Sequence, residues 1–347
     1  MTVEQSTDVP STAQGIVSSL PERFIKAKES NDLFFFPSTV HKHLENGVEF
    51  EIRLCPALQQ KQDLPVPQTD DKQEEKPDEK SKPDPFAPPY VPNLYLGELK
   101  DAEEDTEYVV FFNKYSVVPH HILLVTKEFR PQTAPLMTSD LVQTYQMLLA
   151  ALAAGRKFFA FYNCGVLSGA SQPHKHLQFI PIEDDGPPTE KLARSTHLEV
   201  PSKAFSLNAL PYANHVYRWP SHLGPNTNPE ELSFILTSAF MSLLDLSISS
   251  IRHDPGYPQG PPSYNVLLTL EHLHLIPRRE EWYVLKETQE KLSVNSLGFS
   301  GMLLVKSEAE LEAVKKEGIA NILGGTGVKS VHELQVQGND GEVDLNL

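Results

Sequence analysis

Cysteine is scarce in this chain, and its N-terminus does not resemble a secretory leader. The 347 residues include two cysteines, Cys55 and Cys164, neither with a second cysteine at CxxC spacing. Two cysteines are too few for a disulfide framework, and the spacing argues against a cysteine-based zinc or redox site. The opening MTVEQSTDVPSTAQ is polar, without a basic region followed by an apolar run. We therefore expect a cytoplasmic protein, with the nucleus as the alternative location.

Positive charge and unbroken hydrophobic runs are also in short supply. Lysine and arginine number 30 against 46 aspartates and glutamates, a net charge of −16. This balance argues against nucleic acid and anionic membranes as partners, because both require a broad basic surface. A small polyanion remains possible if a few cations gather in one pocket. The most apolar long segment, LSFILTSAFMSLLDLSISSI, is interrupted by serines and Asp245, which argues against a membrane span.

Proline-rich and acidic stretches divide the chain. Residues 63–89, DLPVPQTDDKQEEKPDEKSKPDPFAPP, combine charge and proline with few apolar side chains. Such a segment cannot offset its ordering entropy by burial, so we expect a mobile excursion. We predict a mobile N-terminus over 1–15, a single catalytic domain over 16–337 with a C-terminal part at 200–337, and an acidic tail over 338–347.

The pattern between these segments predicts strands and two long helices. EYVVFFN, HHILLVT, KFFAFYN, HKHLQFIPI, SYNVLLTLEH and LHLIPR are typical of strands. TSDLVQTYQMLLAALAAG predicts a helix with Thr138 as cap and Gly155 as stop. A second helix follows Asn228, with Pro229 at its first position and Glu231 completing the cap. The phrases HLQFIP and HLHLIP are similar over six residues; we interpret this as coincidence, with an internal duplication as the alternative.

The strand HKHLQFIPI carries the main chemical signal. Because strand side chains alternate, His174, His176 and Gln178 share one face, and Leu177 and Phe179 face a core. The preceding loop, rich in glycine and serine, can turn backbone N–H groups toward a phosphate. A neutral imidazole is a good nucleophile toward phosphorus, and a glutamine amide can hold a phosphoryl oxygen. A phosphoryl-transfer site, a zinc site and a plain half-buried strand all remain possible from these residues alone.

Residues 168–178, SGASQPHKHLQ, resemble the signature of the histidine-triad superfamily, in the His-x-His-x-Gln form of its nucleotidyltransferase branch. Within that branch the chain most resembles the diadenosine tetraphosphate phosphorylases, also called ATP adenylyltransferases. The blocks FFNKYSVVPHHILLVTKEF, FYNCG, SYNVLLT and IPR are similar to that family's and stand in its order. The resemblance covers residues 53–304 apart from the acidic excursion, and FEIRLCPALQQK resembles the family less strongly.

The resemblance implies an α+β fold, a histidine-triad-like antiparallel β-sheet with flanking helices, extended in the manner of the galactose-1-phosphate uridylyltransferase-like branch. It also implies a reversible two-step reaction. His176 would attack the α-phosphorus of diadenosine tetraphosphate, release ATP and carry AMP, which inorganic phosphate would then take as ADP. Sulfate in place of phosphate would give adenylyl sulfate, an ADP-sulfurylase side activity.

The resemblance also assigns site residues. His176 would be catalytic and His174 supporting, and Gln178 would hold the α-phosphate. The other implied substrate-binding positions are the loop residues Ser168, Gly169, Ala170, Ser171 and Gln172, the nucleotide contacts Asn163, Asn113 and Lys114, the distal-phosphate contacts Lys61 and Arg278, and Ser263, Tyr264, Asn265 and Thr269 of the C-terminal strand. The family often has serine where Ala170 stands.

The resemblance implies dinucleoside polyphosphates, ATP, ADP and phosphate as ligands, and a monomer or homodimer as the assembly. We expect no tightly bound cofactor and no protein-bound metal, but a divalent cation such as Mg²⁺ with the nucleotide. The alternatives are a uridylyltransferase, in whose family proline typically replaces Lys175, a dinucleoside polyphosphate hydrolase, and a zinc-binding or nucleotide-sensing non-enzyme. A zinc site on His174 and His176 would need a third ligand, with His120, His121, His272 and His274 as distant candidates. For His272 and His274 we predict surface or interface packing.

Overall fold

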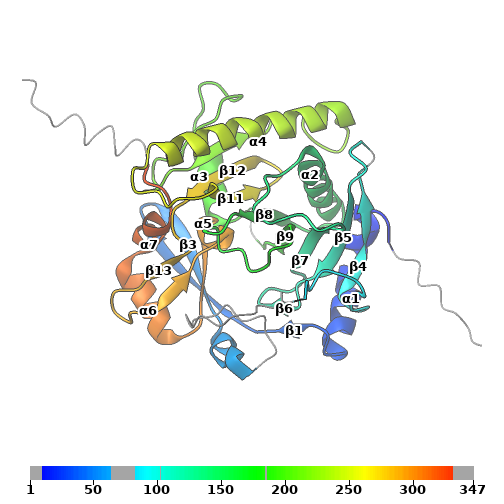
Figure 1. Ribbon diagram of the computed structural model, residues 1–347, viewed down its shortest axis with the longest axis horizontal. Coiled ribbons are helices and arrows are strands. Elements are labelled where there is room, and N and C mark those ends of the chain that lie inside the picture. Colours follow the sequence, from blue (N-terminus) through cyan, green and yellow to red (C-terminus); the bar gives the residue numbers. More distant parts are fainter. Residues whose placement is uncertain (1–9, 64–82, 102, 184–185, 331–347) are drawn as a thin grey trace, which may run out of the picture.

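The computed structural model describes residues 10–63, 83–101, 103–183 and 186–330. At its centre is an eight-stranded sheet in the order β10-β12-β11-β8-β9-β7-β5-β4 (Figure 1). All its pairings are antiparallel. Its strands are β4 (Tyr95–Lys100), β5 (Glu107–Phe112), β7 (Ile122–Thr126), β8 (Phe158–Cys164), β9 (His176–Pro181), β10 (His215–Arg218), β11 (Ser263–Leu268) and β12 (His272–Arg278).

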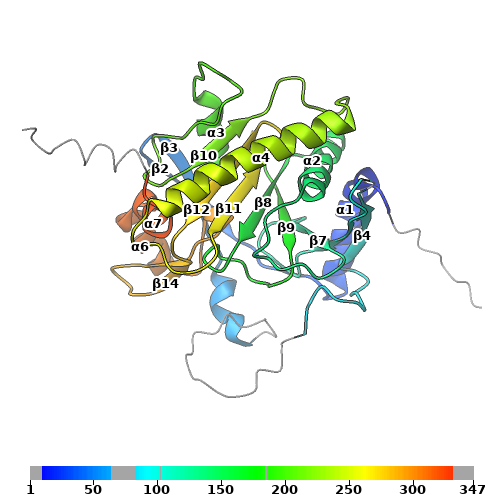
Figure 2. The ribbon, with the colours of Figure 1, turned by 45° about the horizontal axis from the view of Figure 1, so that its top comes forward.

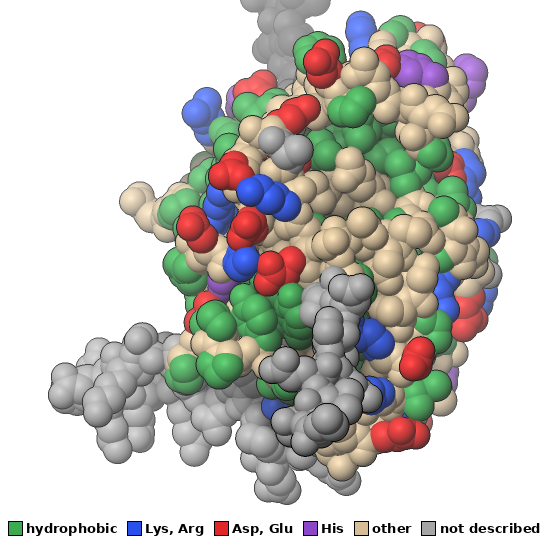
Figure 3. All heavy atoms as spheres, turned by 90° about the vertical axis from the view of Figure 1, so that its right-hand side faces the viewer, with side chains coloured by type: hydrophobic (Ala, Val, Ile, Leu, Met, Phe, Trp, Pro, Cys, Tyr) green, Lys and Arg blue, Asp and Glu red, His purple; other side chains and the backbone are tan. Residues whose placement is uncertain are grey.

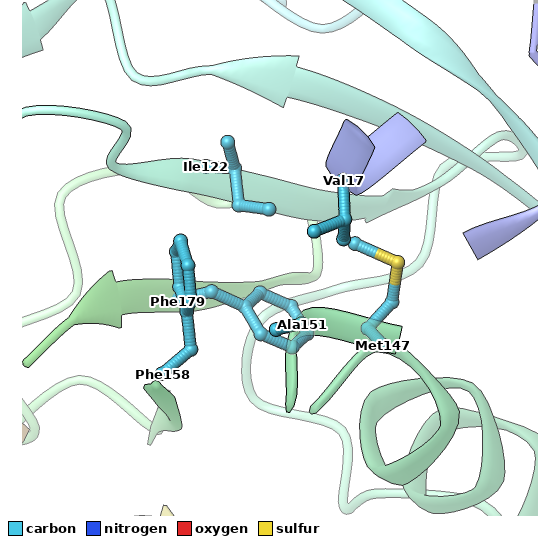
Figure 4. Close-up of a pocket in the computed structure, with 6 residues that line it drawn as sticks. All are labelled: Val17, Ile122, Met147, Ala151, Phe158 and Phe179. Carbon is cyan, nitrogen blue, oxygen red and sulfur yellow. The ribbon is translucent and has the colours of Figure 1, made fainter. Parts of the chain in front are cut away.

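Three helices cover one face of this sheet. They are α1 (Ala13–Glu29), α2 (Thr138–Ala153) and α4 (Pro229–Arg252), and α4 lies across the β10, β12 and β11 end (Figure 2). Apolar side chains from the helices and from alternate strand positions form the larger core, including Leu20, Leu148, Tyr162, Leu236 and Leu275. In Figure 4, six apolar side chains of this layer surround a small gap that no polar side chain lines, so the gap belongs to the core.

The opposite face is covered over part of its width by smaller elements. A three-stranded sheet, β15-β3-β2, packs there with short helices and forms the second core. Its members are β2 (Thr39–Glu45), β3 (Val48–Leu54), β15 (Met302–Val305), α3 (Pro188–Ser195), α5 (Ser296–Phe299), α6 (Glu308–Glu317) and α7 (Ile319–Thr326). The remaining elements are the pair β1 (Phe34–Phe35) and β6 (Tyr115–Ser116), the hairpin β13 (Trp282–Val284) and β14 (Lys291–Ser293), and the 3₁₀ helix η1 (Pro56–Asp63).

The α+β class and the antiparallel sheet with flanking helices are confirmed, as are both long helices. Thr138 as the cap of α2 is wrong by one residue. Met137 holds the N-cap position. The carboxylate of Asp140, in the first turn, accepts a hydrogen bond from the Met137 backbone N–H at 2.7 Å. Asn228 does cap α4, accepting from the Glu230 N–H at 2.9 Å, with Pro229 at the first helical position.

Among the described residues, α4 is the helix long and apolar enough to cross a membrane by length and composition. In this fold it packs against β12, β10 and α2. Leu232, Leu236, Phe240 and Leu243 lie on its buried side. The apolar side chains on that side of α4 thus belong to the core.

The phrases HLQFIP and HLHLIP occupy matching places in the sheet. Each forms the second strand of a helix–strand–strand unit, α2-β8-β9 in one case and α4-β11-β12 in the other. The first strands of the two units, β8 and β11, pair antiparallel at the centre, so the order β9-β8-β11-β12 is symmetric. This arrangement favours the duplication alternative over coincidence.

Parts of the predicted segments lie outside the described residues. These are 1–9 of the predicted N-terminus, 64–82 of the acidic excursion, and the tail 338–347. Residues 13–15 belong to α1. The sheet takes strands from both sides of residue 200, and the predicted single-domain boundaries stay a prediction.

On the face shown in Figure 3, acidic and basic side chains lie intermingled without a broad basic patch.

Candidate active site

His176 is the first residue of β9 and lies on the sheet face opposite the three long helices. His176 pairs with Val125 of β7. Gln178, two residues further along β9, pairs with Phe161 of β8. The alternation predicted for this strand holds from residue 176 onward: Leu177 and Phe179 enter the larger core, and Ile180 enters the second. His174 and Lys175 precede the strand.

Two features of the His176 ring fix its chemical state. Its Nδ1 donates to the carbonyl oxygen of His174 at 2.8 Å, so the lone pair of the neutral ring resides on Nε2. Burial lowers the pKa of His176 to about 4, although the hydrogen bond to His174 acts in the opposite direction. At neutral pH the ring is therefore uncharged and presents Nε2 as a nucleophile.

The backbone of His176 is held by Gln132, which the sequence did not single out. The Gln132 side chain accepts from the His176 N–H at 2.8 Å and donates to the His176 carbonyl at 3.3 Å. It also donates to the carbonyl of Asn163 at 2.8 Å. One buried amide thus connects the start of β9 with the end of β8. Nothing in the local sequence marks this glutamine, because its partners lie 31 and 44 residues away.

Gln178 is oriented by a chain of side-chain hydrogen bonds. The N–H of Tyr115 donates to Asn113 Oδ1 at 3.3 Å, which leaves the Asn113 amide N–H to donate to His121 Nδ1 at 3.0 Å. His121 Nε2 then donates to Gln178 Oε1 at 3.0 Å. Burial lowers the pKa of His121 to about 4, which keeps this ring neutral and the relay intact. The side-chain oxygen of Gln178 already accepts from His121, so the NH₂ group of Gln178 is the part that can donate to a phosphoryl oxygen.

The loop before His174 is held by buried polar side chains from β11 and β12. The carbonyl of Ser168 accepts from Asn265 at 3.0 Å and from Arg278 at 3.2 Å. Ser263 Oγ accepts from the Leu167 N–H at 3.2 Å. Gly169 has φ +75°, and a Cβ there would lie 2.7 Å from the Val294 carbonyl, so this position requires glycine. Ala170, Ser171 and Gln172 are partly or fully exposed.

Arg278 and Asn163 support the site from behind. The guanidinium of Arg278 is fully buried and donates to Asn265 Oδ1 at 2.5 Å and to the Glu280 carbonyl at 2.6 Å. Burial lowers its pKa to about 9, so it stays charged at neutral pH. Asn163 Oδ1 accepts from Asn265 at 2.8 Å and from the Ser296 hydroxyl at 2.6 Å. In this structure Arg278 therefore bonds to the protein's own oxygens, and its predicted contact with a distal phosphate stays a prediction.

Several predicted residues are not brought to His176. Tyr264 faces the helix-covered side of the sheet. Thr269 lies just past the other end of β11 and donates to Glu190 at 2.9 Å. Lys114 is exposed and lies over the rings of Phe34 and Tyr115. The backbone of Lys61 is in η1, and its side chain lies outside the described part of the chain.

His174 is bound through both ring nitrogens. Its Nε2 donates to the Thr126 carbonyl at 2.7 Å, and its Nδ1 lies 2.7 Å from Asp84 Oδ2. Both ring nitrogens of His174 thus face oxygen atoms of the protein. Asp84 comes from the end of the predicted excursion, and no local pattern marks it as a partner of His174.

Among the described residues, the side chains close enough together to share a metal ion are those of Glu190, His272 and His274. This group does not include His174 or His176. His272 Nδ1 and His274 Nε2 donate to the two Glu190 oxygens at 2.7 and 3.0 Å. Arg218 donates to His272 Nε2 at 2.9 Å, so each of these atoms already has a protein partner. All three residues are buried. The predicted surface packing of His272 and His274 is therefore wrong: buried Glu190 pairs with both rings and makes their burial possible.

Comparisons with known proteins find relatives that match most of this chain. The chain is 28% identical to diadenosine tetraphosphate phosphorylase 2 of Saccharomyces cerevisiae over 88% of its length and 91% of the relative's. The crystal structure of yeast Ap4A phosphorylase Apa2 is similar, with a TM-score of 0.73 and 25% identity over 93% of this chain and 96% of that one. A crystal structure of the same yeast protein in complex with AMP has a TM-score of 0.72 and 25% identity, over 93% of this chain and 98% of that one.

Two family models match successive parts of the sequence. The model of the ATP adenylyltransferase C-terminal domain matches residues 208–329, and that of the Ap4A phosphorylase N-terminal domain matches residues 6–193. The second match alone spans more than half of the 347 residues. The chain therefore belongs to the Ap4A phosphorylase family.

Proposed function

We propose that this protein is a nucleotidyltransferase that cleaves diadenosine tetraphosphate (Ap4A) with inorganic phosphate to ADP and ATP, reversibly, through AMP bound to His176. Membership of the Ap4A phosphorylase family supports this activity over uridylyl transfer and over non-catalytic zinc or nucleotide binding. The single observation that carries the residue assignment is the neutral, buried His176 ring with Nδ1 occupied and Nε2 left as the nucleophile.

The first step transfers AMP to the enzyme. The Nε2 lone pair of His176 attacks the α-phosphorus, the bond from that phosphorus to the oxygen of the β-phosphate breaks, and ATP leaves with that oxygen. As the new N–P bond forms, the Nδ1–H bond to the His174 carbonyl stabilises the charge that develops on the ring. The NH₂ group of Gln178, aimed by His121, donates to an α-phosphoryl oxygen.

The second step passes AMP to phosphate. A phosphate oxygen attacks the α-phosphorus, the N–P bond breaks, and its electron pair returns to Nε2, which gives ADP and the neutral ring. Sulfate attacking in the same way would give adenylyl sulfate. Mg²⁺ or a similar divalent cation is expected to bind the substrate's own phosphate oxygens and reduce their charge.

The test is a phosphate-dependence assay with identification of products. Wild-type protein with Ap4A and phosphate should give ADP and ATP in equal amounts, and no turnover should occur without phosphate. His176→Ala should lose turnover by a factor of about 10⁴ or more, since the nucleophile is removed. His253→Ala is the matched control, because His253 is exposed at the end of α4. Formation of AMP and ATP without any need for phosphate would identify a hydrolase instead.

A further inference from the structure

The end of the acidic stretch returns to the site just described. Asp84 Oδ2 lies 2.7 Å from His174 Nδ1, and Asp84 Oδ1 accepts from the Phe86 N–H at 2.9 Å. The Ala87 N–H also donates to the Asp84 carbonyl at 3.2 Å. These bonds form a tight turn whose anchor is the His174 ring. The turn therefore fixes where the Phe86 side chain lies.

Phe86 lies against the histidines. Its ring centroid is 5.4 Å from that of His176 and 5.9 Å from that of His174. Phe86 also stacks on Phe111, with ring centroids 6.1 Å apart, and packs on the small apolar cluster that includes Val109, Leu123 and Val125. Phe86 itself is partly exposed, while His176 is only 2% exposed. An apolar ring thus separates the nucleophile from solvent on this side.

Water exclusion matters because of the chemistry of the covalent intermediate. An AMP group on imidazole nitrogen is reactive toward any oxygen nucleophile, and water is far more concentrated than phosphate. Attack by water would release AMP and a proton, whereas attack by phosphate gives ADP. A phenyl ring offers no donor or acceptor that could position a water molecule beside the phosphorus. A hydroxyl or amide at the same place would provide one.

We propose that Phe86, anchored through Asp84 to His174, is a specificity-determining residue that excludes water from the AMP–His176 bond, so that phosphate takes the AMP. This inference rests on the proposed function. Asp84 acts through His174 and is a positioning residue.

The experiment measures the ratio of AMP to ADP formed from Ap4A at several phosphate concentrations in ¹⁸O-labelled water. Phe86→Ala should raise that ratio by about tenfold or more, with ¹⁸O in the AMP, because the pocket beside the phosphorus becomes wet. Phe86→Leu keeps an apolar side chain and should stay within about twofold of wild type. Asp84→Asn should raise the ratio too, because the weaker bond to His174 loosens the turn. Phe234→Ala is the matched control: Phe234 is 72% exposed on α4.

The outcomes separate the two claims. Wild-type protein that makes no ADP from Ap4A and phosphate contradicts the proposed function itself. If the wild type makes ADP and both Phe86→Ala and Asp84→Asn keep its product ratio, the water-exclusion inference is wrong and the function stands. The inference also fails if Phe86→Ala only raises KM for Ap4A at an unchanged ratio, because the ring would then bind substrate. A raised AMP share in Asp84→Asn supports it even where Phe86→Ala folds poorly.

Discussion

The ring of His176 has two nitrogens, and the backbone carbonyl of His174 accepts from one of them. The spacing of HKHLQ predicts that His176 and Gln178 share one strand face, because strand alternation is a local property, and the family resemblance implies their roles. The partners Gln132, His121 and Asp84 were not predicted as part of the site, since each reaches it from a distant part of the chain. The sequence suggests His121 only as a distant candidate zinc ligand.

The pH dependence of the first step tests the state of His176. Its pKa of about 4 means that the reactive neutral ring is lost only as pH falls through that value. At saturating phosphate, kcat/KM for Ap4A should therefore be flat with respect to this group from about pH 5.5 to 8 and fall below about pH 4.5. Initial rates after brief pH jumps would measure this profile. An acid limb centred near the ordinary histidine value would show that burial does not act as described.

The relay behind Gln178 predicts a non-additive pair of variants. Gln178→Ala removes a phosphoryl donor and should lower kcat by about 10²-fold. His121→Ala leaves the amide in place but free to turn, and we expect a loss of about tenfold. The double variant should resemble Gln178→Ala alone, because His121 acts only through Gln178. If the losses of kcat in the two single variants multiply in the double variant, His121 does not act through Gln178.

At the scale of elements, propensity and capping predicted the existence and type of the long helices and main strands, with ends shifted by up to four residues. The order of strands was beyond the sequence, because pairings such as β8 with β11 join segments 100 residues apart. The burial of His272 and His274 was missed for the same reason. It depends on Glu190 of α3, 82 and 84 residues away.

Glu190 connects α3 with β12 and with Thr269 at the end of β11, and its removal should destabilise the fold. Burial raises its pKa, but the hydrogen bonds from His272 and His274 outweigh this and hold the pKa well below its ordinary value. Glu190→Ala leaves the buried His272 Nδ1–H and His274 Nε2–H without their acceptor, and we expect a loss of about 3–5 kcal/mol in the free energy of unfolding. Glu190→Gln keeps the shape and should lose less. Urea unfolding measures both; an alanine variant as stable as wild type would contradict the pairing.

For the whole molecule, several histidines are buried in neutral form. Burial lowers the pKa values of His121, His176 and His215 to about 4. The unfolded chain binds these protons near pH 6.5, so between about pH 6.5 and 4 it holds more protons than the fold, and stability falls as pH falls. Each group contributes up to about 3 kcal/mol to this fall.

We therefore expect the midpoint of thermal unfolding to drop steeply from pH 6.5 to 4 and to change little between pH 7 and 8. The lowered pKa of Glu190 adds to the loss only below about pH 4.5, where the carboxyl of the unfolded chain takes up its proton before that of the fold. In a His215→Gln variant the unfolding midpoint should fall less between pH 6.5 and 4 than in wild type. A midpoint unchanged down to pH 4.5 would contradict the neutral burial of these rings.

The covalent step is the central claim of the account, and mass spectrometry tests it most directly. Protein mixed with excess Ap4A in phosphate-free buffer, then quenched at alkaline pH to preserve the N–P bond, should gain the mass of one adenylyl group. Peptide mapping should place that group on His176, and addition of phosphate before the quench should remove it as ADP. Turnover of Ap4A by wild-type protein with no such adduct, or an adduct retained in His176→Ala, would contradict the assignment of His176 as the carrier of AMP.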